Sequence, residues 1–424
     1  MTASSPILVD TTRLLTRLKH PSPSGIDRVD LAYARQFLNG EPDRLAIGIG
    51  YFGPRILPDP LRQKLIRTVA ERWGEDLPAG QDPVLAEIRR RLRGDGASAG
   101  AARSGSAGRL PRFKHEAADQ ILKLSGFRWR RAEHAPRGAI YLHTSHLRLD
   151  RPEHFAWLGK RPDVRAVFFV HDLIPIEFPE YVVPGEDERH RARMTTVARH
   201  AAAVLVNSAD VGERFARHCR QSGLPSPPVT VAPLAVEPVF LDTPRRPAAG
   251  RPYFVICSTI EARKNHLLLL QVWRELAGRL GPETPALVIV GRRGWESEAA
   301  IDLLDRSPAL RGHVFEASGL STGGLAELVA GARALLMPSF AEGYGIPIVE
   351  ALTVGTPVLA SDIPVHREVA GQRARFIDPL DGPAWLGAVE NLSQTEAETV
   401  EGYAPPTWRA HFAAVNHLLR ELGT

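Results

Sequence analysis

Two glutamates, Glu342 and Glu350, stand eight positions apart in the segment 339–362, which begins as a glycine-containing loop. A carboxylate does not bind a phosphate, but it accepts hydrogen bonds from hydroxyl groups. Between the two, Gly343 and Gly345 carry no Cβ, so the backbone can turn tightly and come close to a ligand. The pattern predicts a binding loop flanked by carboxylates. Two solvated glutamates around an ordinary loop are the simpler alternative.

A short helix is expected after this loop. Pro347 fits its first position and Gly355 fits the residue just past its end, which predicts about two turns with Glu350 in the first. Free N–H groups and the positive end of the helix dipole favour an anion such as a phosphate at the helix start. Helical side chains lean toward the N-terminus, so Glu350 faces the same place. A molecule with phosphates in its middle and hydroxyls at both ends fits such a site, and nucleotide sugars have this shape.

The segment resembles the Glu-x7-Glu signature of retaining glycosyltransferases of family 4, because the helix, the TPVLASD strand and the flanking residues are also present. The resemblance implies that Glu342 contacts the transferred sugar and that Glu350 contacts the ribose hydroxyls. The candidates for donor binding are Ser258, Thr259, Gly343, Tyr344, Gly345, Ile346 and Glu350.

A predicted strand at the start of the second half runs into Arg263 and Lys264, in the stretch STIEARKNHLLLL. Ligands of open α/β sheets bind at the carboxyl ends of the strands, so two cations there would hold a diphosphate and stabilise its charge as it leaves. The stretch resembles the basic strand–loop motif of the same family, which holds the donor diphosphate, although many relatives have Gly where this chain has Ser258. A charged helix cap is the alternative.

A second motif lies in the first half, where the apolar strand in FFVHDLIPIEFPEY ends in His171 and Asp172. A histidine there can donate a hydrogen bond to a sugar hydroxyl or share a proton near the reacting carbon. The HDLIPxxxPE pattern is similar to that of family members that often transfer mannose, in which the histidine lies beside the donor sugar. A purely structural histidine is the alternative. The catalytic candidates are therefore His171, Arg263, Lys264 and Glu342.

Candidates for acceptor binding come from two other loops of the first half. SGIDRV resembles the N-terminal glycine loop of these enzymes, which lines the cleft opposite the donor, while YLHTSHL offers polar side chains at another strand end. Ordinary loop polarity explains the second stretch equally well. The acceptor candidates are Gly25, Arg28, His143, His146 and Asp172. No HExxH or DxD pattern accompanies the histidines, so we expect no metal and no cofactor besides the GDP- or UDP-sugar donor.

The chain has 424 residues, of which 44% are hydrophobic and 24% charged, as is usual for a globular protein with two domains. Short apolar strands alternate with helices, which indicates parallel sheets covered on both faces. The resemblance implies the GT-B architecture, in which two Rossmann-like domains face each other across a cleft. We expect an acceptor-binding domain at 1–242, a nucleotide-sugar domain at 243–400 and a helix at 401–424 that crosses back.

Within this plan, several element boundaries can be predicted. Residues 7–15 read as the first strand, 26–38 as an amphipathic helix and 229–236 as the last strand of the first half. The stretch 403–422 predicts a final amphipathic helix.

An insert at about 55–135 has no counterpart in the resemblance. Its residues 94–108 are poor in large apolar side chains, so we expect them to be mobile. Residues 109–134 combine arginines and lysines with aromatic side chains, which suits an anionic membrane surface or an ordinary helix with a solvated basic face. With two cysteines and no leader or spanning segment apparent, we expect a cytoplasmic protein, with peripheral contact to the inner membrane left open.

The resulting hypothesis is transfer of a hexose, mannose from GDP-mannose, onto a surface polysaccharide or its lipid-linked precursor. A nucleotide-sugar hydrolase or synthase on the same fold is one alternative, and a non-catalytic scaffold of a polysaccharide assembly complex is another. The net charge of +5 comes without a nucleic-acid-binding motif, and no GxGxxG follows a strand, so we expect neither nucleic acid nor NAD as a partner.

Overall fold

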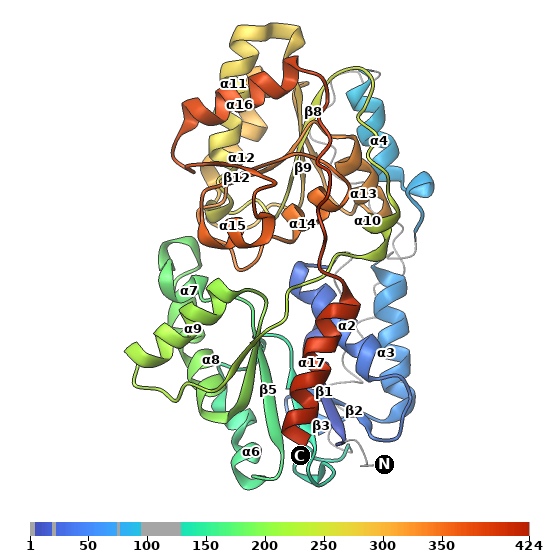
Figure 1. Ribbon diagram of the computed structural model, residues 1–424, viewed down its shortest axis with the longest axis vertical. Coiled ribbons are helices and arrows are strands. Elements are labelled where there is room, and N and C mark those ends of the chain that lie inside the picture. Colours follow the sequence, from blue (N-terminus) through green and yellow to red (C-terminus); the bar gives the residue numbers. More distant parts are fainter. Residues whose placement is uncertain (1–4, 19–22, 74–76, 95–128, 424) are drawn as a thin grey trace.

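The computed structural model describes residues 5–18, 23–73, 77–94 and 129–423, which form two stacked α/β halves (Figure 1). The first sheet has the strand order β3-β2-β1-β4-β5-β6-β7 and the second has the order β10-β9-β8-β11-β12-β13. Neighbouring strands are parallel in both sheets apart from the antiparallel pair β2 and β3. The predicted α/β fold with two sheets is confirmed.

The strands are short, and those at the centre of each sheet are buried along their length, as expected for sheets covered on both faces. The first sheet contains β1 (Ile7–Asp10), β2 (Arg44–Gly50), β3 (Gly53–Ile56), β4 (Ile140–His143), β5 (Arg165–Val170), β6 (Ala201–Val206) and β7 (Val229–Val231). The second contains β8 (Tyr253–Cys257), β9 (Ala286–Val290), β10 (Val314–Ala317), β11 (Leu335–Met337), β12 (Val358–Ser361) and β13 (Arg375–Ile377).

Helices pack on the faces of both sheets. Up to the linker, the described helices are α1 (Thr12–Arg17), α2 (Gly25–Phe37), α3 (Asp59–Arg72), α4 (Pro83–Leu92), α6 (Ala156–Lys160), α7 (Ile174–Glu177), α8 (Glu186–His200), α9 (Ala209–Gln221) and α10 (Pro238–Asp242). Those that follow are α11 (His266–Leu280), α12 (Glu298–Arg306), α13 (Thr322–Gly331), α14 (Ile346–Thr353), α15 (Pro364–Ala370), α16 (Gly382–Gln394) and α17 (Trp408–Gly423). Short 3-10 turns include η1 (Ala79–Gln81), η5 (Pro179–Tyr181) and η6 (Ala262–Lys264).

Two strand predictions were too long. The first strand ends at Asp10, whose Oδ1 accepts a hydrogen bond from the Thr12 N–H at 2.9 Å and turns the chain into α1. The last strand of the first half ends at Val231, shortly before Pro233, which has no N–H to continue the ladder. By contrast, α2 begins and ends within one residue of its predicted limits.

The insert is divided between the two halves. Its helix α3 packs on α1 and α2, whereas η1 and α4 pack on α13 of the second half. Most of the glycine-rich stretch predicted to be mobile, and most of the basic stretch 109–134, lie outside the described residues. No helix within the described ranges is both long and apolar enough to cross a bilayer.

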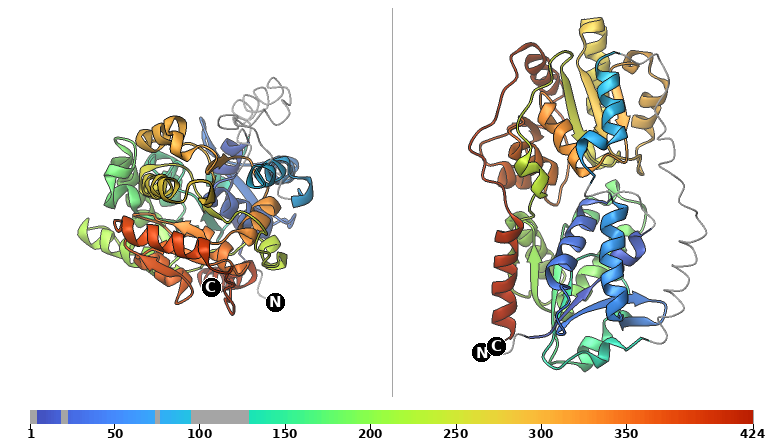
Figure 2. Two further views of the ribbon diagram at one scale, coloured as in Figure 1. Left: turned by 90° about the horizontal axis from the view of Figure 1, so that it is seen from above. Right: turned by 90° about the vertical axis from the view of Figure 1, so that its right-hand side faces the viewer.

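The final helix α17 runs along the first half and ends near the N-terminus (Figure 2). It starts at Trp408 rather than near residue 403, since Pro405 and Pro406 interrupt the helix pattern. His411 anchors it: Nδ1 donates to the Pro233 carbonyl at 3.0 Å, and Nε2 accepts from the Tyr33 hydroxyl at 2.9 Å. The helix thus joins the last segment of the chain to α2.

Candidate functional site

The loop before α14 requires a glycine. Gly345 is the residue that precedes the helix, and its φ of 100° lies in the left-handed region that side chains with a Cβ rarely adopt. The helix spans eight residues, and Gly355 follows its end with a φ of 77°. Because the helix begins at Ile346, Glu350 is its fifth residue and lies in the second turn, so its predicted place in the first turn is wrong.

Glu342 is held by two cations from η6, at the carboxyl end of β8. Lys264 Nζ donates to its Oε1 at 2.5 Å, and an Arg263 guanidinium N–H donates to its Oε2 at 3.0 Å. Burial alone would raise the pKa of Glu342, which is 5% exposed, but Lys264 and Arg263 lower this pKa to about 2. The glutamate is therefore ionised throughout the physiological range.

The two cations differ in their surroundings. Burial and the neighbouring charge of Arg263 lower the pKa of Lys264, although the carboxylate of Glu342 acts to raise it. The pKa of Arg263 is raised, because Glu342 and Glu261 outweigh its burial; a second guanidinium nitrogen lies 2.7 Å from Glu261. The sequence-based expectation that Arg263 and Lys264 lie beside the Glu342 loop is met, and the arrangement can present two cations to a phosphate.

His171 approaches this loop from the first half. Its Nε2 donates to the Thr144 carbonyl at 2.7 Å, and burial lowers its pKa to about 4, so the ring is neutral. In this tautomer Nδ1 can accept a hydrogen bond from a hydroxyl but cannot donate the one that the sequence suggested. A Cβ at position 343 would lie 2.5 Å from the His171 carbonyl oxygen, so Gly343 permits the contact between the halves.

Glu350 also has a partner in the first half. An Arg28 guanidinium N–H from α2 donates to its Oε1 at 3.0 Å. Burial raises the pKa of Glu350, and Glu237 adds to this effect while Arg28 opposes it. Gly25, at the start of α2, faces Ile346, since a Cβ there would lie 3.3 Å from the Ile346 Cδ1. Gly25 and Arg28, predicted for the acceptor, thus contact residues predicted for the donor.

The remaining acceptor candidates make contacts within the first half. His143 is fully buried, with Nδ1 2.9 Å from the Tyr141 hydroxyl, so this acceptor candidate is not accessible to an acceptor. His146 is partly buried and accepts the His171 N–H at 3.1 Å through Nε2. Asp172 accepts the Ile174 N–H at 3.2 Å and so caps the turn that follows β5.

The remaining donor candidates also make contacts within the protein. Ser258 Oγ lies 3.4 Å from His266 Nε2, and Thr259 packs against Gly294, both beyond the end of β8. The Tyr344 hydroxyl donates to the Leu234 carbonyl of the first half at 3.0 Å. Tyr344, like Ile346, therefore helps to join the two halves.

Sequence reasoning missed three residues at this site. Glu261 is buried beside Arg263, and Arg214 of α9 donates to the Glu342 carbonyl at 3.3 Å. His366 contacts Gly345, and its buried Nε2 has no hydrogen-bond partner among the described residues. Glu261 stood in the quoted STIEARKNH motif and could have been identified there. Arg214 and His366 come from distant helices that no motif marks.

Within the described ranges, the histidines, cysteines and acidic residues form no cluster of three suited to a metal ion.

Comparison with known proteins finds similarity that includes the second half of the chain. Residues 242–396 match the family model described as glycosyl transferases group 1. The Escherichia coli "Serotype-specific mannosyltransferase WbdA" is 30% identical over 266 residues, which cover 58% of this chain and only 32% of that protein. The E. coli "O-antigen chain mannosyltransferase B" is 29% identical over 257 residues, 57% of this chain and 65% of that protein. This chain therefore spans less than two thirds of the length of either relative.

Solved structures share the fold. Anabaena Alr3699/HepE in complex with UDP and glucose superposes with a TM-score of 0.58 at 14% identity and covers 99% of this chain and 97% of that one. Sucrose-phosphate synthase from Thermosynechococcus elongatus gives a TM-score of 0.54 at 17% identity, over 76% of this chain and 82% of that one. The two-sheet arrangement is that of GT-B glycosyltransferases.

Proposed function

We propose that this chain is a retaining glycosyltransferase that moves a hexose from a nucleotide sugar onto a saccharide or lipid-linked saccharide of a surface polysaccharide. We further propose mannose as the sugar and GDP-mannose as the donor. The observation that carries the proposal is the convergence of Lys264 and Arg263 on Glu342, within the part of the chain that matches group 1 glycosyl transferases.

Each group at the site has a role in this reaction. Arg263, Lys264 and the amides of the loop at Gly343 and Gly345 bind the leaving diphosphate and stabilise its growing charge. The bond from the sugar C1 to the diphosphate oxygen breaks, and the acceptor oxygen bonds to C1 on the same face. The proton of the acceptor hydroxyl passes to an oxygen of the departing diphosphate, so the protein supplies no nucleophile.

The two carboxylates recognise hydroxyl groups. Glu342 stays ionised at neutral pH and accepts hydrogen bonds from the sugar, while His171 Nδ1 accepts another from the opposite side of the cleft. Glu350 receives the ribose hydroxyls, which requires that it share or release its contact with Arg28.

Mannose as the transferred sugar is supported by the names of the E. coli relatives and by the stretch HDLIPIEFPE after β5. For the base, the HepE structures hold UDP rather than GDP. Both nucleotides therefore belong in the test.

Thermal unfolding with GDP, UDP, ADP, GDP-mannose and UDP-glucose tests the donor site. A ligand at about 100 times its Kd adds roughly 2.7 kcal/mol to the stability of the folded state. We expect GDP and GDP-mannose to raise the Tm of the wild type and to raise that of Glu350→Ala much less. Glu283→Ala, which removes an exposed glutamate from the second half, is the matched control and should respond like the wild type.

The outcomes separate the parts of the proposal. Stabilisation by UDP alone would keep the donor site and replace the base. No stabilisation by any nucleotide at millimolar concentration would remove the donor site and leave the scaffold alternative. Product analysis with and without a saccharide acceptor distinguishes transfer from hydrolysis, and undiminished transfer by Glu342→Ala and Lys264→Ala would contradict the assigned roles.

A further inference from the structure

A groove of about 660 Å³ lies between α2 and α17, which pack against each other in the first half (Figure 1). The start of α10, at Glu237 and Pro238, completes its lining. The volume lies within the range of small-molecule sites, roughly 300–1,000 Å³. The groove is therefore large enough to hold an organic molecule.

This groove adjoins the candidate functional site. Arg28 lines it and also donates to Glu350 Oε1 at 3.0 Å. Glu237 lines it as well, and its negative charge helps to raise the pKa of Glu350, so the two carboxylates lie close to each other. A molecule in the groove would thus lie beside the place proposed for the donor.

Most polar side chains of the lining offer hydrogen-bonding groups that the protein does not use. Arg28 and Arg35 already have partners. Four others form no hydrogen bond or ion pair with another described residue, namely the side chains of Gln36, Glu237, Arg409 and Asn416. An amide donates and accepts, a carboxylate accepts and a guanidinium donates. Together these groups match a ligand that carries several hydroxyls.

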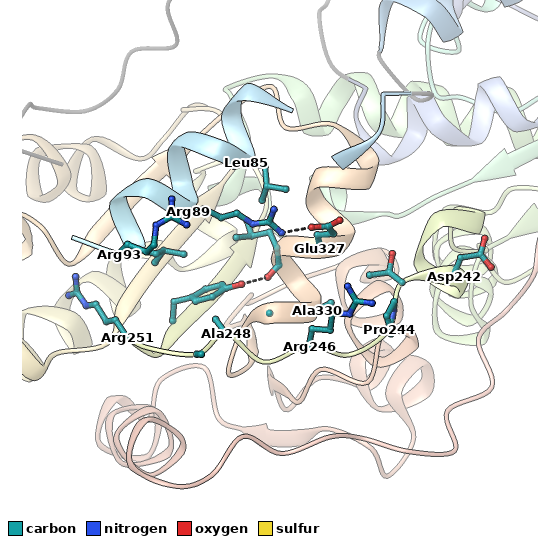
Figure 3. Close-up of a pocket in the computed structure, with 16 residues that line it drawn as sticks. Leu85, Arg89, Arg93, Asp242, Pro244, Arg246, Ala248, Arg251, Glu327 and Ala330 are labelled. Carbon is teal, nitrogen blue, oxygen red and sulfur yellow. Dashed lines mark hydrogen bonds and ion pairs between the residues drawn. The ribbon is translucent and has the colours of Figure 1, made fainter. Parts of the chain in front are cut away.

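The pocket of about 460 Å³ between α4 and the linker 242–251 shows the opposite case (Figure 3). Arg89 is paired there with Glu327, and Arg251 donates to backbone carbonyls of the second half. These charged groups are used for contacts within the protein, so they do not indicate a ligand.

Aromatic side chains form the apolar part of the groove between α2 and α17. Trp408 is partly buried, and its ring stacks on Phe412 with centroids 5.5 Å apart and an angle of 23° between the planes. Phe412 packs in turn on Tyr33 and Phe37 of α2, so the position of the indole is fixed. The C–H groups on one face of a sugar ring pack well on such an aromatic surface, while the hydroxyls remain free to form hydrogen bonds.

We propose that this groove binds a saccharide, with one sugar ring packed on Trp408 and its hydroxyls bonded to the four unused polar side chains. The proposal rests on the proposed function, because the ligand is a part of the saccharide chain that the transferase extends. A chain held beside the cleft stays near the protein between successive transfers, which raises the effective concentration of its reactive end.

Calorimetric titration with mannotriose and with maltotriose tests the groove. We compare the wild type with Gln36→Ala/Asn416→Ala and with Gln271→Ala/Asn391→Ala, a control that removes the same residue types from exposed positions on α11 and α16. Each lost hydrogen bond should raise the Kd about 2- to 10-fold. Both variants keep the candidate functional site, so GDP-mannose should raise the Tm of all three proteins alike.

Tryptophan fluorescence identifies the place of binding. A bound saccharide should change the emission of the wild type, and Trp408→Phe, which keeps an aromatic ring on Phe412, should lose this change. A change that persists in Trp408→Phe would contradict the role of Trp408.

Two results would overturn the proposal as a whole. One is that the groove variant binds both saccharides as tightly as the control variant does, and the other is that the wild type binds neither at millimolar concentration. If GDP-mannose still raises the Tm in these cases, the donor site stands and only the groove assignment fails. If no nucleotide raises the Tm of any of the proteins, the proposed function itself fails.

Discussion

Glu342 keeps its negative charge inside the protein because two cations lie against its two oxygens. Desolvation of an isolated carboxylate would favour its protonated form, and here the opposite charges prevail. The same ion pairs fix the positions of both cations. With a neutral residue at 342, the positive charges of Lys264 and Arg263 would repel each other without a neighbouring negative charge between them.

This balance predicts a pH dependence of stability. The pKa of Glu342 in the folded protein, about 2, is below its ordinary value of 4.5, so ionised Glu342 stabilises the fold above pH 4.5. The contribution is of the order of 3 kcal/mol and is lost as the pH falls from 4.5 toward 2. Urea unfolding should show Glu342→Gln less stable than the wild type at pH 7, with a difference that shrinks at pH 3.

Glu283→Gln, at an exposed position, serves as the control for this series and should follow the wild type at every pH. A difference between Glu342→Gln and the wild type that stays constant from pH 7 to pH 3 would contradict the stated origin of the effect.

Arg28 and Glu350 lead to a second prediction. Arg28→Ala leaves a carboxylate that is only 3% exposed without its cation, which should cost up to about 3 kcal/mol at pH 7. The change raises the pKa of Glu350 further above its ordinary 4.5, so the cost should fade below pH 4.5, where the unfolded chain also binds the proton. Urea unfolding at pH 7 and pH 4 measures both values.

The double variant Arg28→Ala/Glu350→Gln removes the buried charge together with its partner and should recover most of the loss. If the two single changes simply add in the double variant, the pair is not coupled and the interpretation fails.

At this scale, the sequence predicted the groups that stand in local motifs. Arg263, Lys264 and Glu342 meet because strand ends gather at one edge of a parallel sheet. The ion pairs of Arg263 and Lys264 with Glu342 could not be predicted, since they depend on the distances between side chains that only the folded structure gives. His143 shows the opposite case: its position at a strand end is as predicted, but its burial depends on Phe155, Phe168 and Tyr141 packing around it.

Among the elements, α4 shows how a short helix is held by its N-cap residue, Asp82. Asp82→Ala removes the N-cap and the acceptor for the Ser321 amide, which should cost about 1–2 kcal/mol locally. Hydrogen exchange of the α4 amides, residues 83–92, should then be about 5- to 30-fold faster. Asp82→Asn keeps one oxygen acceptor, but its NH2 group cannot accept the second hydrogen bond, so its exchange rates should lie between those of the wild type and Asp82→Ala. Equal exchange in Asp82→Ala and the wild type would show that the cap does not hold α4.

The predicted limits of helices and strands were correct where the apolar spacing and the capping residues indicate the same limits. They were wrong where the apolar spacing was the only guide. For α2, the apolar spacing and the Ser24–Asp27 capping box indicate the same limits. For residues 7–15, the apolar Leu14 and Leu15 extended the predicted strand, although the Asp10 turn ends it. The attachment of α4 to the other half depends on tertiary contacts that no local pattern encodes.

For the whole molecule, α17 connects the end of the chain to the first half. Phe412 is 7% exposed and packs on Tyr33 and Phe37 of α2, with ring centroids 5.2 and 5.8 Å away. Phe412→Ala should lower the free energy of unfolding by about 3–5 kcal/mol, measured in urea. Arg409→Ala, an exposed change on the same helix, should have little effect. A loss below about 1 kcal/mol for Phe412→Ala would mean that α17 contributes little to the fold.

The alternation of strands and helices was sufficient to predict two α/β halves, because it reflects local sequence. How the halves meet was not predictable. The contacts between the two halves join residues far apart in the chain: Arg28 with Glu350, Tyr344 with the Leu234 carbonyl, and the Glu368 carboxylate with the amides of Ala209 and Asp210. The donor proposed to bind Glu350 must therefore loosen part of this interface.

The insert limits how far the two halves can separate, because a short stretch of it connects them covalently. Trp73 is buried against the first half and Ala79 lies against Gly323 of the second half. Six residue steps separate them and span at most about 20 Å when fully extended. The halves therefore cannot separate widely on this side. Any large opening must be a rotation of one half relative to the other about a hinge near this connection. The opposite side, where α9 faces α15 in Figure 1, then travels farthest, so the hydrogen bonds of Glu368 to the Ala209 and Asp210 amides must break.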